Sequence, residues 1–469
     1  MKYSSQAVAK PYFIFALVLL AGEILFGLLM AIQYLYGDFL FPLIPFNVLR
    51  MVHTNLLIVL ILFGFMGATY YLIPEESERE LWSPKLAIIT FWVFAAAGVA
   101  TILGYLFVPY AQLTELTFNN ILPTMGREFL EQPLPSKLGI VLVVVSYIVN
   151  VAMTVLKGRR TVITTVLITG LLGLAVFFLI AFYLPENLIL DKFLWWFTVH
   201  LWVEATWEVF VGCLAAYGLI KIIGARREVV EMWLWIEVSM LFGSGILGMG
   251  HHYFWIGTPE YWWEIGALFS ALEPVPLVAM FVHVVYDWGK ETGLKAGTEE
   301  KTMNNSPAFA WFVTNAFGNF LGAGIWGFFH TLPQVNIYTH GTQFTSAHGH
   351  LAFFGAYATI LIGMMYLAVQ GKNGIKVMNN TTSTIFSTSM IVGGVVGMTV
   401  ALTVAGYSDV IISRAQMGAT WAGYFDAQAT TWLVQGLVWR LLMGVITFVG
   451  FIFLAKDLLT IGKSANHVR

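Results

Sequence analysis

Residues 52–73 read VHTNLLIVLILFGFMGATYYLI, an apolar run long enough for one membrane-spanning helix. A helix that crosses the hydrocarbon core of a bilayer needs about 20 mostly apolar residues. Similar runs recur along the chain, and they are continuous, whereas the strands of a membrane β-barrel alternate between apolar and polar residues. The sequence therefore predicts an all-α, polytopic membrane protein.

The composition supports this fold class. Of the 469 residues, 58% are hydrophobic and only 11% are charged, which is too apolar for a water-soluble globule. Twelve segments are predicted to span the membrane: 13–33, 52–73, 86–107, 138–156, 163–183, 194–220, 231–257, 264–286, 308–330, 345–369, 385–407 and 432–456. Since no long linker divides them, we expect one integral-membrane domain over residues 1–469, with ordered loops at 108–137 and 408–431.

The distribution of positive charge predicts how the chain is oriented. With twelve spans, most of the 24 lysines and arginines fall on the side that carries both termini, and positive charge concentrates in cytoplasmic loops. We therefore expect both termini to be cytoplasmic. The net charge of −2 gives no reason to expect a nucleic-acid partner. The single cysteine, Cys213, excludes a CxxCH site for covalently attached heme on this chain.

The histidines are the polar residues that point to chemistry. Six of them are predicted to lie within about two turns of the outer ends of four different spans: His53, His200, His251, His252, His348 and His350. One such histidine alone is better explained by a hydrogen bond to a neighbouring helix. Six at one depth are not, because polar residues in spans are costly and usually functional and imidazole suits heme, non-heme iron and copper.

Helical periodicity divides these histidines into groups. His348 and His350 are two residues apart, about 200° around a helix, so they face opposite sides and suit two hemes. His200 and Glu204 are four apart and share one face, and the adjacent histidine pair of the seventh span can approach the same metal. Three imidazoles and a carboxylate suit iron better than copper. His53 remains as the partner for a heme on the tenth span.

Six motifs in a fixed order carry a resemblance to a known family: RMVHTNLLI at 50–58, MGREFLEQP at 125–133, HLWVEATWE at 200–208, GHHYFWIG at 250–257, SALEP at 270–274 and THGTQFTSAHGH at 339–350. Together they resemble the heme-copper oxidase superfamily and, within it, the large subunits of cytochrome c-dependent nitric oxide reductases. The resemblance covers nearly the whole chain and implies a bundle like subunit I of the heme-copper oxidases.

The resemblance implies a role for each residue in the motifs. It makes His53 and His350 the axial ligands of a low-spin heme b and His348 the proximal ligand of a high-spin heme b. The non-heme iron would be held by His200, His251 and His252, with Glu204 as a fourth ligand or close neighbour. Glu128 would help to bind a calcium ion, and Arg50 would meet the heme propionates. Apart from the resemblance, a buried pocket that needs protons favours carboxylates as carriers, and the candidates are Glu204, Glu208 and Glu273, although Glu273 could instead cap the kink at SALEP.

The implied reaction is the reduction of two nitric oxide molecules to nitrous oxide and water, and two rival functions remain. An oxygen-reducing terminal oxidase of the same superfamily usually has a tyrosine where this chain has Glu204, or a tyrosine on the span with the histidine pair, and residues 231–250 contain none. A secondary transporter that relays protons through histidines would show broken helices and an internal repeat. Neither is found in the sequence.

The resemblance also implies partners and a location. Electrons would come from a small membrane-anchored subunit that carries heme c, fed by cytochrome c or a similar soluble donor. The protein would act in denitrification as part of a respiratory chain in the bacterial inner membrane, surrounded by lipid. We expect the active site on the periplasmic side, because the six histidines lie near the outer ends of their spans, and we expect protons to enter from the same side, because the inner halves of the spans carry few polar residues. His283 and His467 are expected to take no part, whereas a supporting role for His330 and His340 stays open.

Overall fold

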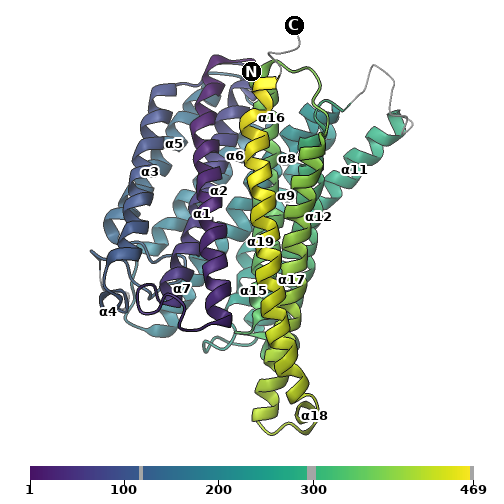
Figure 1. The fold of residues 1–469 in the computed structure, drawn as a ribbon. Helices are drawn as coiled ribbons and strands as arrows, with labels where there is room; N and C mark the ends of the chain where they lie inside the picture. Colours follow the sequence, from purple (N-terminus) through teal and green to yellow (C-terminus); the bar gives the residue numbers. More distant parts are fainter. Residues whose placement is uncertain (116–119, 293–302, 465–469) are drawn as a thin grey trace.

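The computed structural model describes residues 1–115, 120–292 and 303–464, so that His467 lies outside the described residues. Within these ranges the chain forms helices and no strands, which confirms the all-α prediction. The long helices run side by side in one bundle (Figure 1). The start of α1 and the end of α19 lie at the same end of the bundle (Figure 1), as an even number of crossings requires.

The helices have the following bounds: α1 (Ala9–Leu35), α2 (Phe46–Glu76), α3 (Pro84–Phe107), α4 (Tyr110–Leu113), α5 (Leu134–Leu156), α6 (Val162–Leu179), α7 (Leu188–His200), α8 (Glu208–Ile223), α9 (Arg227–Gly248), α10 (Tyr261–Ser270), α11 (Val275–Thr292), α12 (Ser306–Gly318), α13 (Gly327–Thr331), α14 (Pro333–Thr339), α15 (Gln343–Ala352), α16 (Thr359–Asn373), α17 (Thr382–Gln416), α18 (Thr420–Gly423) and α19 (Asp426–Ser464). Three π-helical segments join pairs of them: Leu201–Trp207, Asn319–Trp326 and Phe353–Ala358. Such segments occur frequently at functional sites.

Eleven helical runs in the described residues are long and apolar enough to cross a membrane. The one predicted span outside this set, the ninth at 308–330, is also helical, because α12, a π-helical segment and α13 continue without a break from Ser306 to Thr331. It is less apolar because it contains Asn315 and Asn319. Both are buried and bond to neighbouring helices: Asn315 Nδ2 donates to the carbonyl of Ala356 at 2.7 Å, and Asn319 Nδ2 donates to Glu208 at 2.9 Å.

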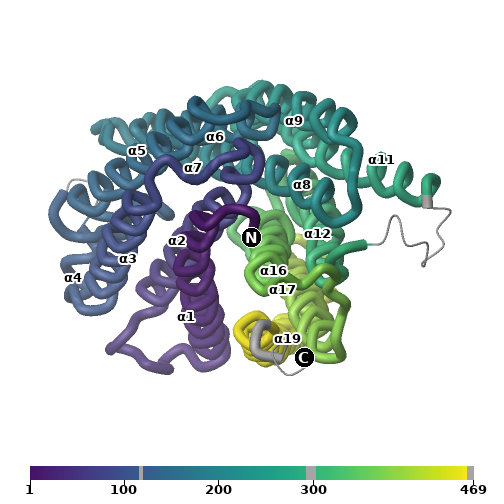
Figure 2. Tube along the Cα trace, turned by 90° about the horizontal axis from the view of Figure 1, so that it is seen from above, coloured from purple at the N-terminus to yellow at the C-terminus, as the bar shows by residue number. Residues whose placement is uncertain are grey.

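The spans that carry most of the predicted ligands are also the most enclosed. Within an apolar 18-residue stretch of each span, the share of buried residues is 83% in α2, 89% in the run Leu188–Ile223 and 72% in the run Gln343–Asn373, against 22–44% in the other spans. Seen from above, α2, α8 and α16 lie toward the middle, with α3, α5, α6 and α9 in an arc outside them (Figure 2). The protein therefore surrounds the helices that bear the histidines with other helices rather than with lipid.

One predicted loop is wrong. Residues 408–431 were expected to form a loop, but α17 continues to Gln416 and α19 begins at Asp426, with α18 between them. This helical hairpin extends beyond the rest of the bundle at the end opposite to the start of α1 (Figure 1). The turn comes at Gly418, whose φ of +81° suits glycine. A hydropathy pattern does not detect these extensions, because they are more polar than the spans and still helical.

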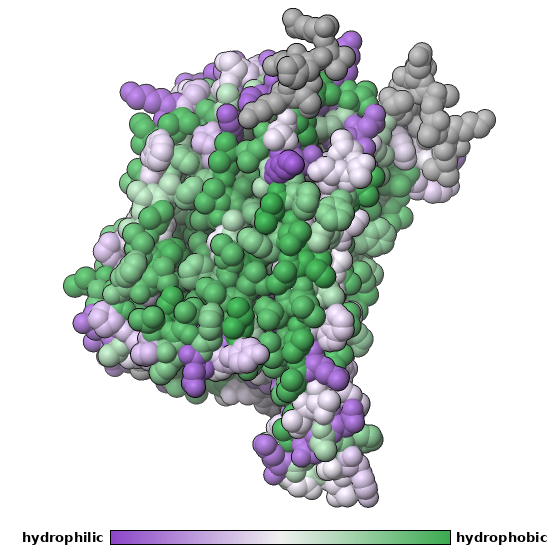
Figure 3. Space-filling model, in the orientation of Figure 1, coloured by the Kyte–Doolittle hydropathy of each residue, from purple (hydrophilic) through white to green (hydrophobic). Residues whose placement is uncertain are grey.

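The surface of the bundle matches a membrane environment. In the face shown in Figure 3, apolar residues form a broad belt around the middle, and polar residues gather at the two ends and on the protruding hairpin. Many large apolar side chains on the outside are exposed, including Trp92 at 66% and Val176 at 58%. A soluble protein rarely exposes so much contiguous apolar surface, and the hydrocarbon core of a bilayer provides a matching solvent.

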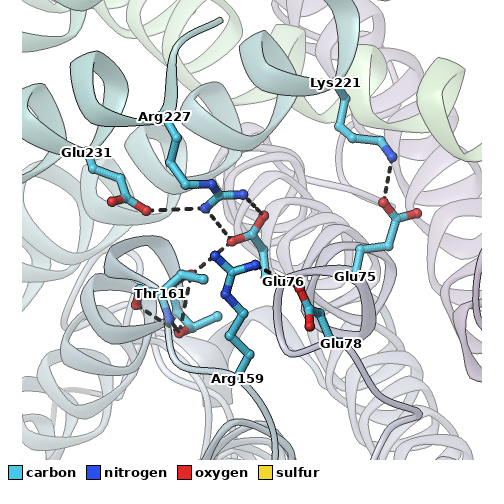
Figure 4. A network of polar contacts seen from close by, with 9 residues as sticks. Glu75, Glu76, Glu78, Arg159, Thr161, Lys221, Arg227 and Glu231 are labelled. Atoms are coloured by element: carbon cyan, nitrogen blue, oxygen red, sulfur yellow. Dashed lines mark hydrogen bonds and ion pairs between the residues drawn. The ribbon is translucent and has the colours of Figure 1, made fainter. Parts of the chain in front are cut away.

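At the end that carries the start of α1, a polar network ties several helices together (Figure 4). Arg227 at the start of α9 binds the buried carboxylate of Glu76 at the end of α2 through both terminal nitrogens, each at 2.9 Å. Thr161, which precedes α6, donates to the same carboxylate at 2.9 Å, and Lys221 of α8 binds Glu75 at 2.6 Å. The network fixes this end of the bundle relative to the histidines at the other end.

Candidate functional site

Four predicted ligands form one cluster near the hairpin end of the bundle. The ligand atoms of His200, Glu204, His251 and His252 all lie within 4.8 Å of one another. His252 Nε2 is 3.1 Å from His200 Nδ1 and 3.1 Å from Glu204 Oε1, and His251 Nε2 is 3.3 Å from Glu204 Oε2. A single ion at about 2.0–2.1 Å from each ligand atom fits such spacings. We call these four residues the four-residue cluster.

Local backbone structure brings the four-residue cluster together. His200 is the last residue of α7, and Glu204 lies in the π-helical segment that follows it. His251 and His252 lie in a short 3-10 turn, Met249–His252, at the end of α9. Because this turn departs from α-helical geometry, two adjacent histidines both point at the same place, with ring centroids 4.2 Å apart.

His53 and His350 face each other from α2 and α15. Their ring centroids are 6.2 Å apart, which leaves room for one iron between facing nitrogens at about 2 Å from each. His53 Nδ1 lies 2.8 Å from the carbonyl of Glu23, and His350 Nδ1 lies 2.7 Å from that of Ser346. A carbonyl only accepts, so each Nδ1 carries the hydrogen and each Nε2 keeps a lone pair for a metal.

His348 lies on the opposite side of α15 from His350, as the spacing predicts. Its Nδ1 donates to the carbonyl of Gly322 at 3.0 Å, which again leaves Nε2 free to bind a metal. Glycines give two of these rings their space: a side chain at Gly27 would lie 2.9 Å from His53 Cε1, and one at Gly327 would lie 3.1 Å from His348 Cε1. The structure thus presents one pair of imidazoles and one separate imidazole, a set that suits two hemes.

Arg50 and Glu128 are brought together at the end of α2 that is nearer the hairpin. They form an ion pair, although they are 78 residues apart in the chain. Near them, Glu131 accepts a hydrogen bond from Asn55 at 3.0 Å, and burial of this carboxyl raises its pKa to about 7 despite that bond. The loop 120–133 therefore places two carboxylates, those of Glu128 and Glu131, beside the helix that carries Arg50 and His53.

The three predicted proton carriers differ in their surroundings. Glu204 belongs to the four-residue cluster. Glu208 is buried, and its carboxylate accepts bonds from Tyr357 Oη at 3.0 Å and from Asn319 Nδ2 at 2.9 Å. Glu273 lies in the turn between α10 and α11, and its buried Oε1 has no hydrogen-bond partner among the described residues.

The remaining histidines lie apart from the four-residue cluster. His330 packs against His348, with 5.9 Å between ring centroids, and its Nδ1 is 3.3 Å from the hydroxyl of Thr339. His340 is exposed at the end of α14. His283 accepts a hydrogen bond from Trp233 at 3.0 Å, far along α11 from the cluster. Of these, His330 alone lies beside a predicted heme ligand.

Sequence reasoning did not single out several polar residues that the structure places near these groups. Asn319, Glu23, Glu237 and Arg440 are polar residues inside apolar helices, which was a signal that could have found them. Tyr357 gave no signal, because a tyrosine in an apolar run is common. Its contact with Glu208 depends on how two helices pack.

Comparison with known proteins fits this geometry. Residues 7–452 match the model of the family described as cytochrome c and quinol oxidase polypeptide I. The chain is 59% identical over 375 residues to a subunit of the nitric oxide reductase of Stutzerimonas stutzeri, covering 80% of this chain and 77% of that protein. It is 23% identical over 457 residues to the cbb3-type cytochrome c oxidase subunit CcoN1 of the same organism, covering 90% of this chain and 86% of that one.

A solved structure shares the fold. A heme-copper terminal oxidase, determined as a dimer by cryo-EM, superposes with a TM-score of 0.68 at 16% identity, covering 98% of this chain and 84% of that chain. At this identity the likeness concerns the fold alone. The chain therefore belongs to the cytochrome c and quinol oxidase polypeptide I family and, within it, to the group of the nitric oxide reductases.

Proposed function

We propose that this chain is the catalytic subunit of a cytochrome c-dependent nitric oxide reductase, which converts two NO, two protons and two electrons into N2O and water. The observation that carries the proposal is the presence of Glu204 among three histidines in the four-residue cluster. A carboxylate beside three imidazoles makes a harder ligand set than three imidazoles alone, and this favours iron over copper. The 59% identity to the nitric oxide reductase of Stutzerimonas stutzeri supports the same reaction.

The residues fit the cofactors that the family implies. His53 and His350 would hold the low-spin heme b, His348 the high-spin heme b, and the four-residue cluster the non-heme iron. When bound, these groups supply the electrons and the open coordination positions at which NO is reduced. Arg50 would meet heme propionates, and Glu128 would contribute to a calcium site, consistent with their position beside α2.

The chain's own residues would deliver protons to a pocket closed to bulk water. Carboxylates are natural proton carriers in such a place. Glu204 holds its carboxylate against the histidines, Glu208 lies one helical turn further along, and Glu273 approaches from the turn after α10. Tyr357 and Asn319 would act on Glu208 as positioning residues, because each donates a hydrogen bond to its carboxylate.

An oxygen-reducing terminal oxidase is the alternative function. It is favoured by the shared fold and by the 23% identity to a cbb3-type oxidase. The four-residue cluster, however, contains Glu204 at the position where most such oxidases carry a tyrosine, and the identity to the nitric oxide reductase is much higher. A reaction that joins two NO molecules with two electrons needs no phenolic donor for O–O cleavage.

The proposal includes a partner and an orientation. A small membrane-anchored subunit with heme c would supply electrons, from cytochrome c or a similar donor, because this chain has a single cysteine and no CxxCH motif. In a bacterial inner membrane, the end of the bundle that carries the start of α1, the end of α19 and the Arg227 network would face the cytoplasm. The histidines and the protruding hairpin would then lie toward the periplasm.

Metal analysis of the purified complex tests the proposal most directly. We expect one non-heme iron and two hemes b per chain, no copper, and consumption of NO with reduced cytochrome c as donor. Copper in place of non-heme iron, together with oxygen consumption and no NO consumption, would establish the oxidase instead. Chelation with a calcium-specific reagent, followed by heme spectra, separately tests the calcium assignment to Glu128.

A further inference from the structure

Arg440 is a buried cation inside the last span. It lies on α19 with only 5% of its surface exposed, and its Nη1 is buried without a hydrogen-bond partner among the described residues. Its guanidinium lies over the ring of Tyr34 near the end of α1, 4.6 Å from the ring centroid. No carboxylate in the described part of the chain forms an ion pair with it.

A cation in this position requires a counter-charge. Moving a charged side chain into a low-dielectric interior is costly, and buried arginines are almost always paired. One aromatic ring attracts a cation through its quadrupole only and does not neutralise the charge as a carboxylate would. The chain alone therefore leaves Arg440 undercompensated, and its position indicates that an anionic group completes the pocket.

The position of Arg440 identifies that group. One turn after Arg440, a side chain at Gly444 would lie 3.0 Å from Leu28 of α1, and a side chain at the adjacent Gly27 would lie 2.9 Å from Cε1 of His53, which faces His350. In the views along and across the bundle, α19 lies between α1 and α17 (Figures 1 and 2). These two helices pack in turn against α2 and α15, which carry the two histidines. Lipid phosphates are a poor alternative, because a side chain that is 5% exposed offers almost no surface to a lipid headgroup.

We propose that Arg440 pairs with a propionate carboxylate of the low-spin heme and raises the reduction potential of that heme. Arg50, on α2, is already paired with Glu128, so Arg440 is a second and separate cation for the same prosthetic group. A nearby positive charge disfavours the oxidised heme, which carries one more positive charge than the reduced heme. The inference rests on the proposed function in one respect, namely that heme b is bound between His53 and His350.

The test is a spectroscopic redox titration of the purified complex without NO. In Arg440→Gln the side chain keeps its polarity and loses its charge, and we expect reduction of the low-spin heme to become about tenfold less favourable, a downward shift of about 59 mV for a one-electron couple. In Arg440→Lys, which keeps the positive charge, the midpoint potential of the low-spin heme should stay close to that of the wild type. Arg414→Gln is the matched control, because Arg414 also stacks on a tyrosine, at 4.5 Å from the ring of Tyr338, and should shift nothing.

Each outcome decides the inference. An unchanged midpoint in Arg440→Gln, with the full low-spin heme spectrum present, would overturn it. Loss of the low-spin heme in Arg440→Gln but not in Arg440→Lys, with the high-spin heme retained, would support it, whereas loss in both would show that shape rather than charge matters. Because the titration involves no NO, a wild-type complex that fails to consume NO would overturn the proposed function and leave this result standing.

Discussion

The hydroxyl of Tyr357 donates a hydrogen bond to Glu208, with 3.0 Å between Oη and Oε1, and so links the π-helical segment before α16 to the first turn of α8. The same oxygen lies 2.8 Å from the carbonyl of Val203, in the segment that contains Glu204. One phenol thus contacts the backbone of the four-residue cluster's segment and the next carboxylate along it. Because the phenol has one hydrogen, the carbonyl of Val203 and the carboxylate of Glu208 share it.

Removing the hydroxyl of Tyr357 should slow NO reduction without loss of cofactors. In Tyr357→Phe we expect the rate to fall about fivefold, since one neutral hydrogen bond contributes about 1 kcal/mol, while both heme spectra stay unchanged. NO consumption by the purified complex measures the rate. Tyr366→Phe serves as the control, because Tyr366 Oη donates to Asp457 at 2.9 Å elsewhere in the bundle. Equal rates in the two variants would show that the bond to Glu208 has no special role.

Removing the carboxylate of Glu204 should have a larger effect. Glu204 lies 3.1–3.4 Å from three imidazole nitrogens, so Glu204→Ala removes one side of the four-residue cluster. We expect activity to fall at least tenfold and non-heme iron to decrease, as for other changes around metal ligands. Iron analysis and NO consumption are measured together. Glu264→Ala, an exposed glutamate of α10, should change neither, and undiminished activity in Glu204→Ala would contradict the assigned role.

The low-spin heme provides a spectroscopic prediction. His53→Ala removes one of the two facing imidazoles and leaves His348, whose nitrogens face the other side of α15. The low-spin heme spectrum should disappear while the high-spin spectrum remains. His283→Ala, at a histidine bonded to Trp233, should leave both spectra intact. Simultaneous loss of both spectra in a correctly folded His53 variant would show that the two sites are not separate.

Much of the fold and of the histidine arrangement could be predicted because both depend on local rules. Span length follows from helix rise and bilayer thickness, and the spacing of His348 and His350 fixes opposite faces of one helix whatever surrounds it. Comparison with known proteins confirmed the predicted family and fold. The roles of the individual histidines and glutamates stay predictions, which the variants above test.

The rest could not be predicted, because it depends on contacts between segments that are distant in the chain. The π-helical segment Leu201–Trp207 changes the register of Glu204 relative to an α-helix, and hydropathy does not report register. The bond from Asn319 to Glu208 spans 111 residues. The hairpin at α18 was missed for another reason, since helices that leave the membrane become polar and resemble loops in a hydropathy pattern.

Glu131 predicts a dependence of stability on pH. Burial raises the pKa of this carboxyl to about 7 from the usual 4.5, so the folded protein keeps a proton between these values that the unfolded chain has released. The free energy of unfolding should therefore fall as the pH rises through this window, by up to about 3 kcal/mol. Thermal unfolding in detergent at about pH 5 and about pH 8 measures it. The difference should shrink in Glu131→Gln and persist in Glu186→Gln, a change at an exposed outer residue.

Two glutamates with unpartnered buried oxygens test the side from which protons enter. Glu273 lies in the turn after α10, near the four-residue cluster, and Glu237 lies within α9, nearer the Arg227 end. If protons come from the periplasmic side, Glu273→Gln should reduce NO turnover at least tenfold, because proton delivery by a positioned group contributes about 10²–10⁴-fold. In Glu237→Gln turnover should stay within about twofold of the wild type, because protons on this route do not pass the middle of α9. The variant should also fold, since a neutral amide is easier to bury than a carboxylate. The matched pair is measured with complex reconstituted in vesicles that report pH on each side. If NO reduction instead raised the pH on the cytoplasmic side, and Glu237→Gln abolished this rise, protons would enter from the cytoplasmic face.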